Sequence, residues 1–371
     1  MSMRIESAEL RILGMELVSP FETSFGRETE RHCLIVRLRA EGLEGWGECA
    51  ASGRPGYSYE TTGTAWHMMA DFFLPSVLGQ ELEEPGDLAP LLGAFRGHPL
   101  ARAGLEMALW DLAGKRQGKP LAELLGGGRS SVPVGVSVGI QPSVEDLLKT
   151  VEGYRRKGYR RVKLKIKPGK DVVEVAAVRN AHPDLALQVD ANSAYRLDDL
   201  PIFRAMESLD LLLIEQPLAE DDLVDHGKLQ AQLGTPICLD ESIGTVRHAR
   251  QALEIGACRI INIKPGRVGG LSEAVAIHDL CLTGGTPVWC GGMLETGLGR
   301  AANLALASLP GFTLPGDISA TARYYARDIA LPEFVLNPDS TIDVPRGPGL
   351  GVDVVAAAVE QFTIRKESFR L

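Results

Sequence analysis

The chain from Val132 onward alternates short apolar runs with amphipathic helical segments of roughly one fixed length. The runs lie at Val132–Val138, Arg161–Ile166, Ala186–Val189, Leu211–Ile214, Pro236–Leu239, Arg259–Ile263, Thr286–Trp289 and Phe312–Leu314. This rhythm is typical of parallel βα units, and eight such runs predict a closed (β/α) barrel. An open doubly wound sheet is the alternative. We disfavour it because no G-x-G-x-x-G follows a first strand.

Ionisable residues stand at the ends of five successive runs. Asp190, Glu215 and Asp240 end three of them, Lys165 lies near the end of the run before, and Lys264 ends the run after. Neighbouring members of this series are 24 or 25 residues apart, which is one βα unit. Each strand therefore delivers one charged side chain to the same end of the barrel, the end where barrel enzymes carry their active sites.

Asp190, Glu215 and Asp240 form the acidic part of this series. One acidic residue at a strand end commonly caps the following helix. Three in register are different, because barrel closure crowds their carboxylates together, and a cation must then neutralise them. Oxygen ligands without His or Cys favour Mg²⁺ or Mn²⁺ over zinc. We therefore predict that these residues bind Mg²⁺, for which Mn²⁺ or another divalent metal can substitute.

Lysines flank the acidic residues on both sides. Lys163 and Lys165 point to the same face of one strand, and Lys264 approaches from the opposite side. We expect two ammonium groups near a divalent cation to lower each other's pKa, as a lysine base requires near neutral pH. A structural ion pair is the alternative role for Lys163. Lys167 reaches the turn at Pro168-Gly169, and we expect it to be solvated.

The first 130 residues read as a mixed α+β domain. Alternating runs at His32–Arg39 and Leu43–Ala50 predict two strands joined by a turn at Glu41-Gly42. Helical patterns follow at Tyr59–Leu78 and Ala101–Gln117. Two polar stretches, 19–31 and 51–59, predict loops that are free to contact a ligand.

These patterns divide the chain into three parts. We predict an α+β capping domain over residues 1–130, a barrel over 131–322, and a segment over 323–371 that packs back against the capping domain.

Composition excludes several classes of partner. A formal net charge of -9 argues against a nucleic-acid or anionic-membrane surface. No window of 18 uncharged apolar residues and no signal-peptide core is present in the sequence. The cysteines lack zinc-site spacing, which suits small buried side chains in a reducing compartment. We expect a cytoplasmic protein with a small-molecule carboxylate substrate, and with neither nucleic acid nor membrane as a partner.

Several motifs together resemble one known family. The stretches 163–169 (KLKIKPG), 189–193 (VDANS), 214–218 (IEQPL), 239–242 (LDES) and 262–264 (NIK) resemble the muconate-lactonizing subgroup of the enolase superfamily. Within it, the chain is similar to the o-succinylbenzoate synthase/N-succinylamino acid racemase family. Supporting stretches are 21–26 (FETSFG), 54–55 (RP), 135–139 (GVSVG) and 291–295 (GGMLE). The likeness runs from about residue 3 to about residue 352.

The resemblance implies a fold and a division of roles. The fold is a modified (β/α)7β barrel under a cap that the N-terminal part and the C-terminal tail form together. Asp190, Glu215 and Asp240 would hold Mg²⁺, while Lys165 and Lys264 would face opposite sides of the substrate α-carbon. Lys163 would contact the substrate carboxylate and lower the pKa of Lys165. Removal of a proton α to a carboxylate by a lysine beside Mg²⁺ is the chemistry of this superfamily.

The resemblance also implies a set of residues around the substrate. In the barrel these are Ser137, Asn192, Gly292 and Met293, and in the capping loops they are Ser24, Phe25 and Arg54. Asn192 and Glu241 would lie just behind the metal ligands. Two positions depart from the family pattern: Lys170 stands where Trp often follows Pro-Gly, and Tyr57 lies in an altered context. Both departures bear on substrate preference.

Several activities remain open at this point. The leading one is the syn dehydration of o-succinylbenzoate synthase in menaquinone biosynthesis, and racemisation of N-succinyl or other N-acyl amino acids is a close second. A dipeptide epimerase would want D-x-D at the last strand, where this chain has Asp317-Ile318-Ser319. Muconate cycloisomerase is less favoured, and a non-enzymatic barrel would lack one of the five charged residues. We expect a homo-oligomer, either a dimer or an octamer.

Overall fold

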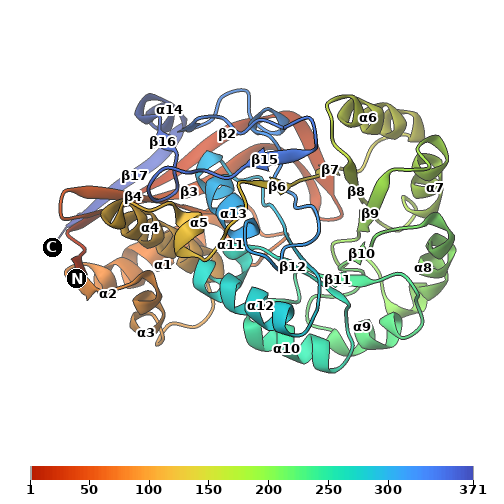
Figure 1. Ribbon diagram of the computed structural model, residues 1–371, viewed down its shortest axis with the longest axis horizontal. Coiled ribbons are helices and arrows are strands. Elements are labelled where there is room, and N and C mark those ends of the chain that lie inside the picture. Colours follow the sequence, from red (N-terminus) through yellow and green to blue (C-terminus); the bar gives the residue numbers. More distant parts are fainter. Residues whose placement is uncertain (1, 371) are drawn as a thin grey trace.

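Seven parallel strands form the curled sheet at the centre of the larger part of the molecule. The computed structural model describes residues 2–370, and Figure 1 shows its architecture. The sheet order is β13-β12-β11-β10-β9-β8-β7, so each strand pairs with its neighbour in the chain. The strands are β7 (Val136–Val138), β8 (Arg161–Lys165), β9 (Ala186–Asp190), β10 (Ile214–Glu215), β11 (Ile237–Leu239), β12 (Ile260–Ile263) and β13 (Val288–Cys290). The sequential order is the one expected for consecutive βα units.

Helices cover the outside of this sheet (Figure 1). They are α6 (Val144–Arg156), α7 (Val172–Ala181), α8 (Leu200–Met206), α9 (Leu223–Gln230), α10 (Val246–Glu254), α11 (Pro265–Val268), α12 (Leu271–Thr283) and α13 (Gly297–Ala307). Several begin with a side-chain cap: the side chains of Ser143, Asp222 and Thr245 accept hydrogen bonds from the first turns of α6, α9 and α10. Such caps satisfy backbone N–H groups that have no partner inside the helix.

The eighth predicted strand, Phe312–Leu314, is not a regular strand. The segment 312–317 instead joins both edges of the sheet through isolated bridges, one to Val288 on β13 and one from Gly316 to Val134. Its backbone donates from Thr313 to Val288 and from Gly316 to Pro133. Pro315 has no N–H to donate, so a continuous ladder cannot form there. The barrel is closed by this irregular segment.

The predicted strand Val132–Val138 is also divided. Its first part, β6 (Ser131–Pro133), leaves the barrel and pairs antiparallel with β15 (Thr341–Asp343), and only its second part becomes β7. Pro133 lies where the run is interrupted, as proline commonly does at strand ends.

An antiparallel four-stranded sheet, order β17-β2-β3-β4, forms the cap. Its strands are β2 (Ser7–Thr23), β3 (Gly26–Ala40), β4 (Leu43–Cys49) and β17 (Thr363–Arg370). The turn between β3 and β4 falls at Glu41-Gly42 as predicted, and both residues have positive φ, 51° and 77°. A two-residue hairpin turn with two positive φ angles matches the twist of the flanking strands.

The predicted loop over residues 19–31 is a β-hairpin. Strands β2 and β3 continue through this stretch, with Thr23 opposite Gly26 and the turn at Ser24-Phe25. The other predicted loop, 51–59, is irregular and takes part only in an isolated bridge at Ser52. The polar sequence of the hairpin concealed the strands, because this part of the ribbon extends beyond the packed part of the sheet.

The C-terminal chain lies against the cap. Strand β17 pairs with β2 from Thr363 opposite Leu13 to Arg370 opposite Ser7. The limits of the three predicted parts, 1–130, 131–322 and 323–371, stay a prediction.

The remaining elements are short apart from α4 (Pro99–Gln117), which packs along β4. They are β1 (Met3–Arg4), α1 (Thr62–Met68), η1 (Met69–Phe73), α2 (Leu74–Val77), β5 (Glu81–Leu82), η2 (Pro85–Asp87), α3 (Leu88–Leu91), α5 (Leu121–Leu124), η3 (Leu197–Asp199), η4 (Glu207–Leu209), η5 (Thr321–Arg323), β14 (Ala330–Leu331), β16 (Asp353–Val354) and α14 (Ala356–Phe362).

All six cysteines are free and buried. Within residues 2–370, no helix has the length and apolar character needed to cross a bilayer.

Candidate active site

The acidic residues of the series lie side by side at the carboxyl ends of the barrel strands. Lys165 is opposite Asp190, and Asp190 is opposite Glu215. Glu215 is in turn opposite Cys238, two residues before Asp240. The side chains of Asp190, Glu215 and Asp240 are completely buried, and we call these three residues the carboxylate row.

Lys163 lies on the floor of the site and contacts three carboxylates. Its Nζ is 2.9 Å from Asp190 Oδ2, 2.8 Å from Glu215 Oε2 and 2.6 Å from Asp317 Oδ2. The ammonium also lies 4.9 Å from the centroid of the buried Trp289 ring. Lys163 is therefore enclosed by the row on one side and by the last barrel segment on the other.

Lys165 and Lys264 contact opposite ends of the row. Lys165 Nζ donates to Asp190 Oδ2 and to Asn192 Oδ1, both at 2.6 Å. Lys264 Nζ donates to Asp240 Oδ2 at 2.6 Å. Because Lys165 ends β8 and Lys264 follows β12, the strands that carry the row lie between them.

Further polar contacts hold these groups in place. Asn192 Nδ2 donates to Glu241 Oε1 at 2.9 Å, so Glu241 lies behind the amide that contacts Lys165. The Tyr57 hydroxyl donates to Asp240 Oδ1 at 2.8 Å and accepts from Lys264 at 3.2 Å. A capping-loop residue therefore touches the far end of the row.

The electrostatics differ along the row. Burial alone would raise the pKa of Asp190, but Lys163 and Lys165 hold it below its ordinary value. The pKa of Asp240 is lowered in the same way by its own cationic neighbours. Burial and the charge of Asp190 raise the pKa of Glu215 well above its ordinary value. The middle carboxyl therefore bears most of the like-charge repulsion.

The carboxylates of the site raise the pKa values of two of its lysines. Burial would lower the pKa of Lys163, but contacting carboxylates, Asp190 first, raise it well above its ordinary value. Burial would likewise lower the pKa of Lys264, but Asp240 raises it, and the pKa of Lys264 lies above its ordinary value. Carboxylates are the nearest charges to both lysines, although Lys163 itself lowers the pKa of Lys264. The expected lowering for Lys163 and Lys165 beside a divalent cation stays a prediction.

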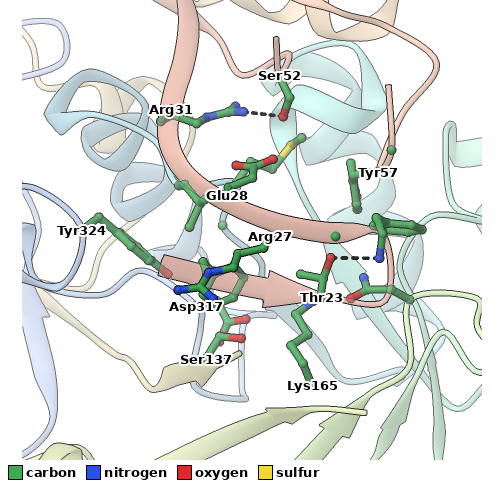
Figure 2. Close-up of a pocket in the computed structure, with 18 of the residues that line it drawn as sticks. Thr23, Arg27, Glu28, Arg31, Ser52, Tyr57, Ser137, Lys165, Asp317 and Tyr324 are labelled. Atoms are coloured by element: carbon green, nitrogen blue, oxygen red, sulfur yellow. Dashed lines mark hydrogen bonds between the residues drawn. The ribbon is translucent and has the colours of Figure 1, made fainter. Parts of the chain in front are cut away.

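A cavity of about 610 Å³ lies above the lysines, between the barrel and the cap (Figure 2). Its volume is within the range of small-molecule sites. Of the predicted site residues it is lined by Lys163, Lys165, Lys264, Ser137, Asn192, Gly292, Met293, Phe25 and Arg54. Ser24 does not line it but donates to the backbone oxygen of Asn192 at 3.1 Å. The carboxylate row lies beneath the lysines, outside the cavity lining.

The β2–β3 hairpin is tied to the barrel at its tip. The backbone N–H of Ile140 donates to the Glu22 oxygen at 2.9 Å, and Lys167 Nζ lies 3.3 Å from Glu22 Oε1. Lys167, which was expected to be only solvated, therefore contributes an ion pair between barrel and cap. Phe25 lies at the tip and lines the cavity.

Two site residues were given no role in the sequence analysis. Asp317 contacts Lys163 and also accepts from Arg161 Nη1 at 2.6 Å. Arg267 contacts Asp240 and donates to the backbone oxygen of Asn262. Asp317 lies three residues after the eighth run, and the sequence analysis considered it only in the comparison with a D-x-D motif. Arg267 does not lie at a strand end, so the regular spacing of the strand ends could not identify it.

The row fits a hard divalent cation by its chemistry. Three adjacent buried carboxylates supply only oxygen donors, and the raised pKa of Glu215 reflects a repulsion that a cation would relieve. Among residues 2–370, no group of three or more His, Cys, Asp and Glu side chains is arranged as a finished metal site. In this arrangement the oxygens of the row face lysine ammonium groups, which a cation would have to displace.

A capped parallel barrel with lysines at both ends of a buried carboxylate row defines an enzyme of the enolase type. Residues 7–126 match the mandelate racemase/muconate lactonizing enzyme N-terminal domain, and residues 146–358 match the enolase C-terminal domain-like family. The chain belongs to the mandelate racemase/muconate lactonizing enzyme family of the enolase superfamily. Enzymes of this superfamily generally use a divalent metal ion.

Individual relatives are similar over nearly their whole length. The chain is 51% identical over 364 residues to an o-succinylbenzoate synthase of Geobacillus stearothermophilus, covering 98% of this chain and 97% of that protein. It is 52% identical over 362 residues to an N-succinylamino acid racemase of Thermus thermophilus, covering 98% of each. A crystal structure of an enolase-superfamily member from Listeria innocua superposes with a TM-score of 0.95 at 41% identity, covering 99% of each chain.

Proposed function

We propose that this enzyme removes the proton α to a substrate carboxylate and acts as an o-succinylbenzoate synthase. The observation that carries the proposal is the placement of Lys165 and Lys264 at opposite ends of the carboxylate row, each facing the cavity. A substrate α-carbon above the row would have one lysine nitrogen on each face. The Geobacillus relative supports this activity by its name.

Asp190, Glu215 and Asp240 would hold the divalent ion, Mg²⁺ or Mn²⁺. When bound, the ion supplies positive charge to the oxygens of the substrate carboxylate and so stabilises the enolate that proton removal creates. Lys163, whose ammonium lies between the row and Asp317, would donate to the same carboxylate. Asn192 and Glu241 would keep Lys165 directed at the α-carbon, through the contacts described above.

In the dehydration, Lys165 would act twice. Its neutral amine takes the α-proton, and the resulting ammonium then gives a proton to the departing hydroxyl, which leaves as water on the same face. Lys264 would stay protonated throughout and stabilise the enolate by its charge. The raised pKa of Lys264 suits this role, because its contact with Asp240 favours the ammonium form.

Racemisation of N-succinylamino acids is the second candidate. It needs a base on one face of the α-carbon and an acid on the other, and both lysines are anchored by a carboxylate at their own end of the row. The Thermus relative bears the name of this activity. Each lysine would then remove the proton from one enantiomer and return a proton to the other.

A dipeptide epimerase is disfavoured by the contacts of the last barrel segment. Asp317 is engaged by Arg161 and Lys163, and Ser319, which stands where a second Asp would be needed, donates to the backbone oxygen of Gly135. No free pair of carboxylates is therefore offered to a substrate ammonium by Asp317 and residue 319. A cytoplasmic location and a homo-oligomeric state, dimer or octamer, stay predictions.

The two lysines can be tested one at a time by hydrogen exchange in D₂O. With Lys165→Ala, one enantiomer of an N-succinylamino acid should lose α-proton exchange, while the other still exchanges without turnover. Lys264→Ala should show the opposite preference, because the remaining base lies on the other face. Proton NMR with each pure enantiomer measures both rates.

Lys228→Ala is the matched control, since Lys228 is exposed on α9 and pairs only with Asp225 and should leave both rates unchanged. For the dehydration, Lys165→Arg should be inactive, whereas Lys264→Arg keeps a positive charge and should retain part of the activity. If both alanine variants still exchange both enantiomers, another base operates and the proposal is wrong.

A further inference from the structure

The cap side of the cavity carries two arginines that have no protein partner. Arg27 and Arg54 both line the cavity and are exposed. Across residues 2–370, neither guanidinium has a hydrogen bond to a protein group or an ion pair within 4.0 Å. A positive charge that faces a binding cavity without a partner indicates a negative group on the ligand.

The other cations of the cavity each contact protein groups. Lys163, Lys165 and Lys264 each contact carboxylates of the barrel. Arg31 is buried and donates to Ser52 and to the backbone oxygen of Ala50. The positive charge left for a ligand outside the α-carbon region is therefore that of the two cap arginines.

The one acidic residue on the cap side of the cavity does not cancel them. Glu28 lines the cavity, but it acts on Arg31: burial would lower the pKa of Arg31, and neighbouring charges, led by Glu28, raise it. Three arginines, Arg27, Arg31 and Arg54, line this side of the cavity together with Glu28, so the cap side keeps an excess of positive charge.

Arg27 is better placed than Arg54 to bind a ligand group in the cavity. It belongs to β3 and is paired with Glu22, the residue that ties the hairpin to the barrel through Ile140 and Lys167. In Figure 2 its guanidinium points from the hairpin toward the side of the cavity where Ser137, Asp317 and Tyr324 lie. Arg54 lies on the irregular stretch 51–59, so its position is less constrained.

We propose that Arg27 binds a second carboxylate of the substrate, remote from the α-carbon. The inference rests on the proposed function, since it places the first carboxylate beside Lys163 and the carboxylate row. The substrates of the proposed function already carry two acid groups, and Arg27 would bind at the cap hairpin the one that lies away from the barrel floor. The succinyl group in the names of both relatives ends in such a carboxylate. A planar guanidinium can bind it through two parallel hydrogen bonds.

The test compares two ligands that differ in the remote acid group and the methylene that carries it. N-succinylglycine and N-acetylglycine share the α-carboxylate and the amide, and glycine cannot be racemised, so binding is separated from turnover. Calorimetry with the Mg²⁺-loaded enzyme should give tighter binding of the succinyl ligand. In Arg27→Gln this preference should fall by about tenfold, the size expected for one charge-assisted contact. Arg27→Lys should keep part of it, because an ammonium offers charge without the planar fork.

Kinetics on an N-succinyl and an N-acetyl amino acid should show the same change in KM for the succinyl substrate. Arg250→Gln, which alters an exposed arginine on the outer helix α10, should leave the preference intact. The assignment is overturned if Arg27→Gln keeps the wild-type preference, or if only Arg54→Gln reduces it. Failure of the proposed function would look different: the wild-type enzyme would then exchange no α-proton of N-succinylglycine in D₂O.

Discussion

Tyr57 links a catalytic candidate of the barrel to the cap. Its hydroxyl bridges Asp240 and Lys264, and its ring lies under the Lys264 ammonium, with 4.2 Å from Nζ to the ring centroid. Burial and the charge of Asp240 raise the pKa of the hydroxyl above its ordinary value, so it stays protonated and can donate. Lys165 has no comparable partner from the cap among its hydrogen bonds, which are to Asp190 and Asn192.

Removal of the Tyr57 hydroxyl should therefore affect the two faces of the substrate unequally. Tyr57→Phe keeps the ring but loses both hydrogen bonds, each of which contributes about 1 kcal/mol. We expect exchange of the enantiomer that depends on Lys264 to slow by about tenfold, and exchange of the other enantiomer to change little. NMR exchange rates in D₂O measure both, with the exposed Tyr59→Phe as the control. Equal slowing of both enantiomers would mean that Tyr57 acts on substrate binding instead.

At the scale of single residues, the sequence analysis identified the site residues that regular strands hold in place. Lys165, Asp190, Glu215, Asp240 and Lys264 were found from their spacing, because each parallel βα unit returns the chain to the same end of the barrel. Tyr57, Arg27 and Asp317 were not assigned roles in this way. They come from the cap or from the irregular segment 312–317, where no period relates sequence position to place.

Helix α13 begins against a carboxylate supplied by the cap. Glu48 on β4 accepts from the backbone N–H groups of Thr296 and Gly299 and from the Thr296 hydroxyl at 2.6 Å. The neighbouring Glu295 accepts from the N–H of Met293, which lines the cavity. Burial, then the charge of Glu295, raises the pKa of Glu48 to about 7. This contact fastens the cap to the barrel close to the substrate wall.

The raised pKa of Glu48 predicts a dependence of stability on pH. Its folded pKa of about 7 exceeds the ordinary 4.5, so its contribution to stability is full below pH 4.5 and is lost as pH rises through 7. Glu48→Gln can still accept the hydrogen bonds but cannot ionise. Between pH 5 and 8 the wild type should therefore lose stability relative to Glu48→Gln, by an amount on the order of 1–3 kcal/mol.

Urea unfolding midpoints across this pH range measure the difference. Glu333→Gln, at an exposed carboxylate, should follow the wild type at every pH. A constant offset between wild type and Glu48→Gln would show that Glu48 keeps one charge state throughout.

At the scale of elements, the sequence predicted the strands and the helix whose burial follows a regular pattern. It did not predict the hairpin tip or the irregular segment that closes the barrel. The runs that became β8 to β13 and the helix α4 were recognised, because buried strands and a long, mostly buried helix leave clear patterns. The hairpin tip was taken for a loop, since the sequence of residues 19–31 is mostly polar. The eighth strand was expected as regular, but Pro315 breaks its ladder.

The carboxylate row connects metal binding to the stability of the whole molecule. If the row binds Mg²⁺ only when folded, free Mg²⁺ at 100 times its dissociation constant should stabilise the protein by about 2.7 kcal/mol. The midpoint of thermal unfolding should rise when Mg²⁺ is added and fall again with a chelator. In Asp190→Asn the rise should be much smaller, because the site loses one full negative charge.

Comparing the shift within each variant removes differences in starting stability. Asp279→Asn, at an exposed carboxylate on α12, should respond to Mg²⁺ as the wild type does. An equal rise in Asp190→Asn and in the wild type would place the ion elsewhere, and no rise in the wild type would contradict the predicted metal site.

The general architecture, a capped barrel, was predictable because motif order and βα rhythm agree along most of the chain. The sequence did not predict which residues join the cap to the barrel. That depends on single contacts between distant residues, such as Glu22 with Lys167 and Glu48 with Thr296. Such contacts leave no local pattern.

The pairing of β2 with β17 has a consequence for the order in which the protein is made. All the barrel strands lie between these two strands in the chain, so a ribosome delivers β2 before the barrel and β17 after it. Until β17 arrives, one edge of β2 has no partner strand, and unpaired edges favour association with other chains. Contacts so distant in sequence also form slowly. The sheet that carries the substrate-facing hairpin can therefore be completed only after every barrel strand has been made.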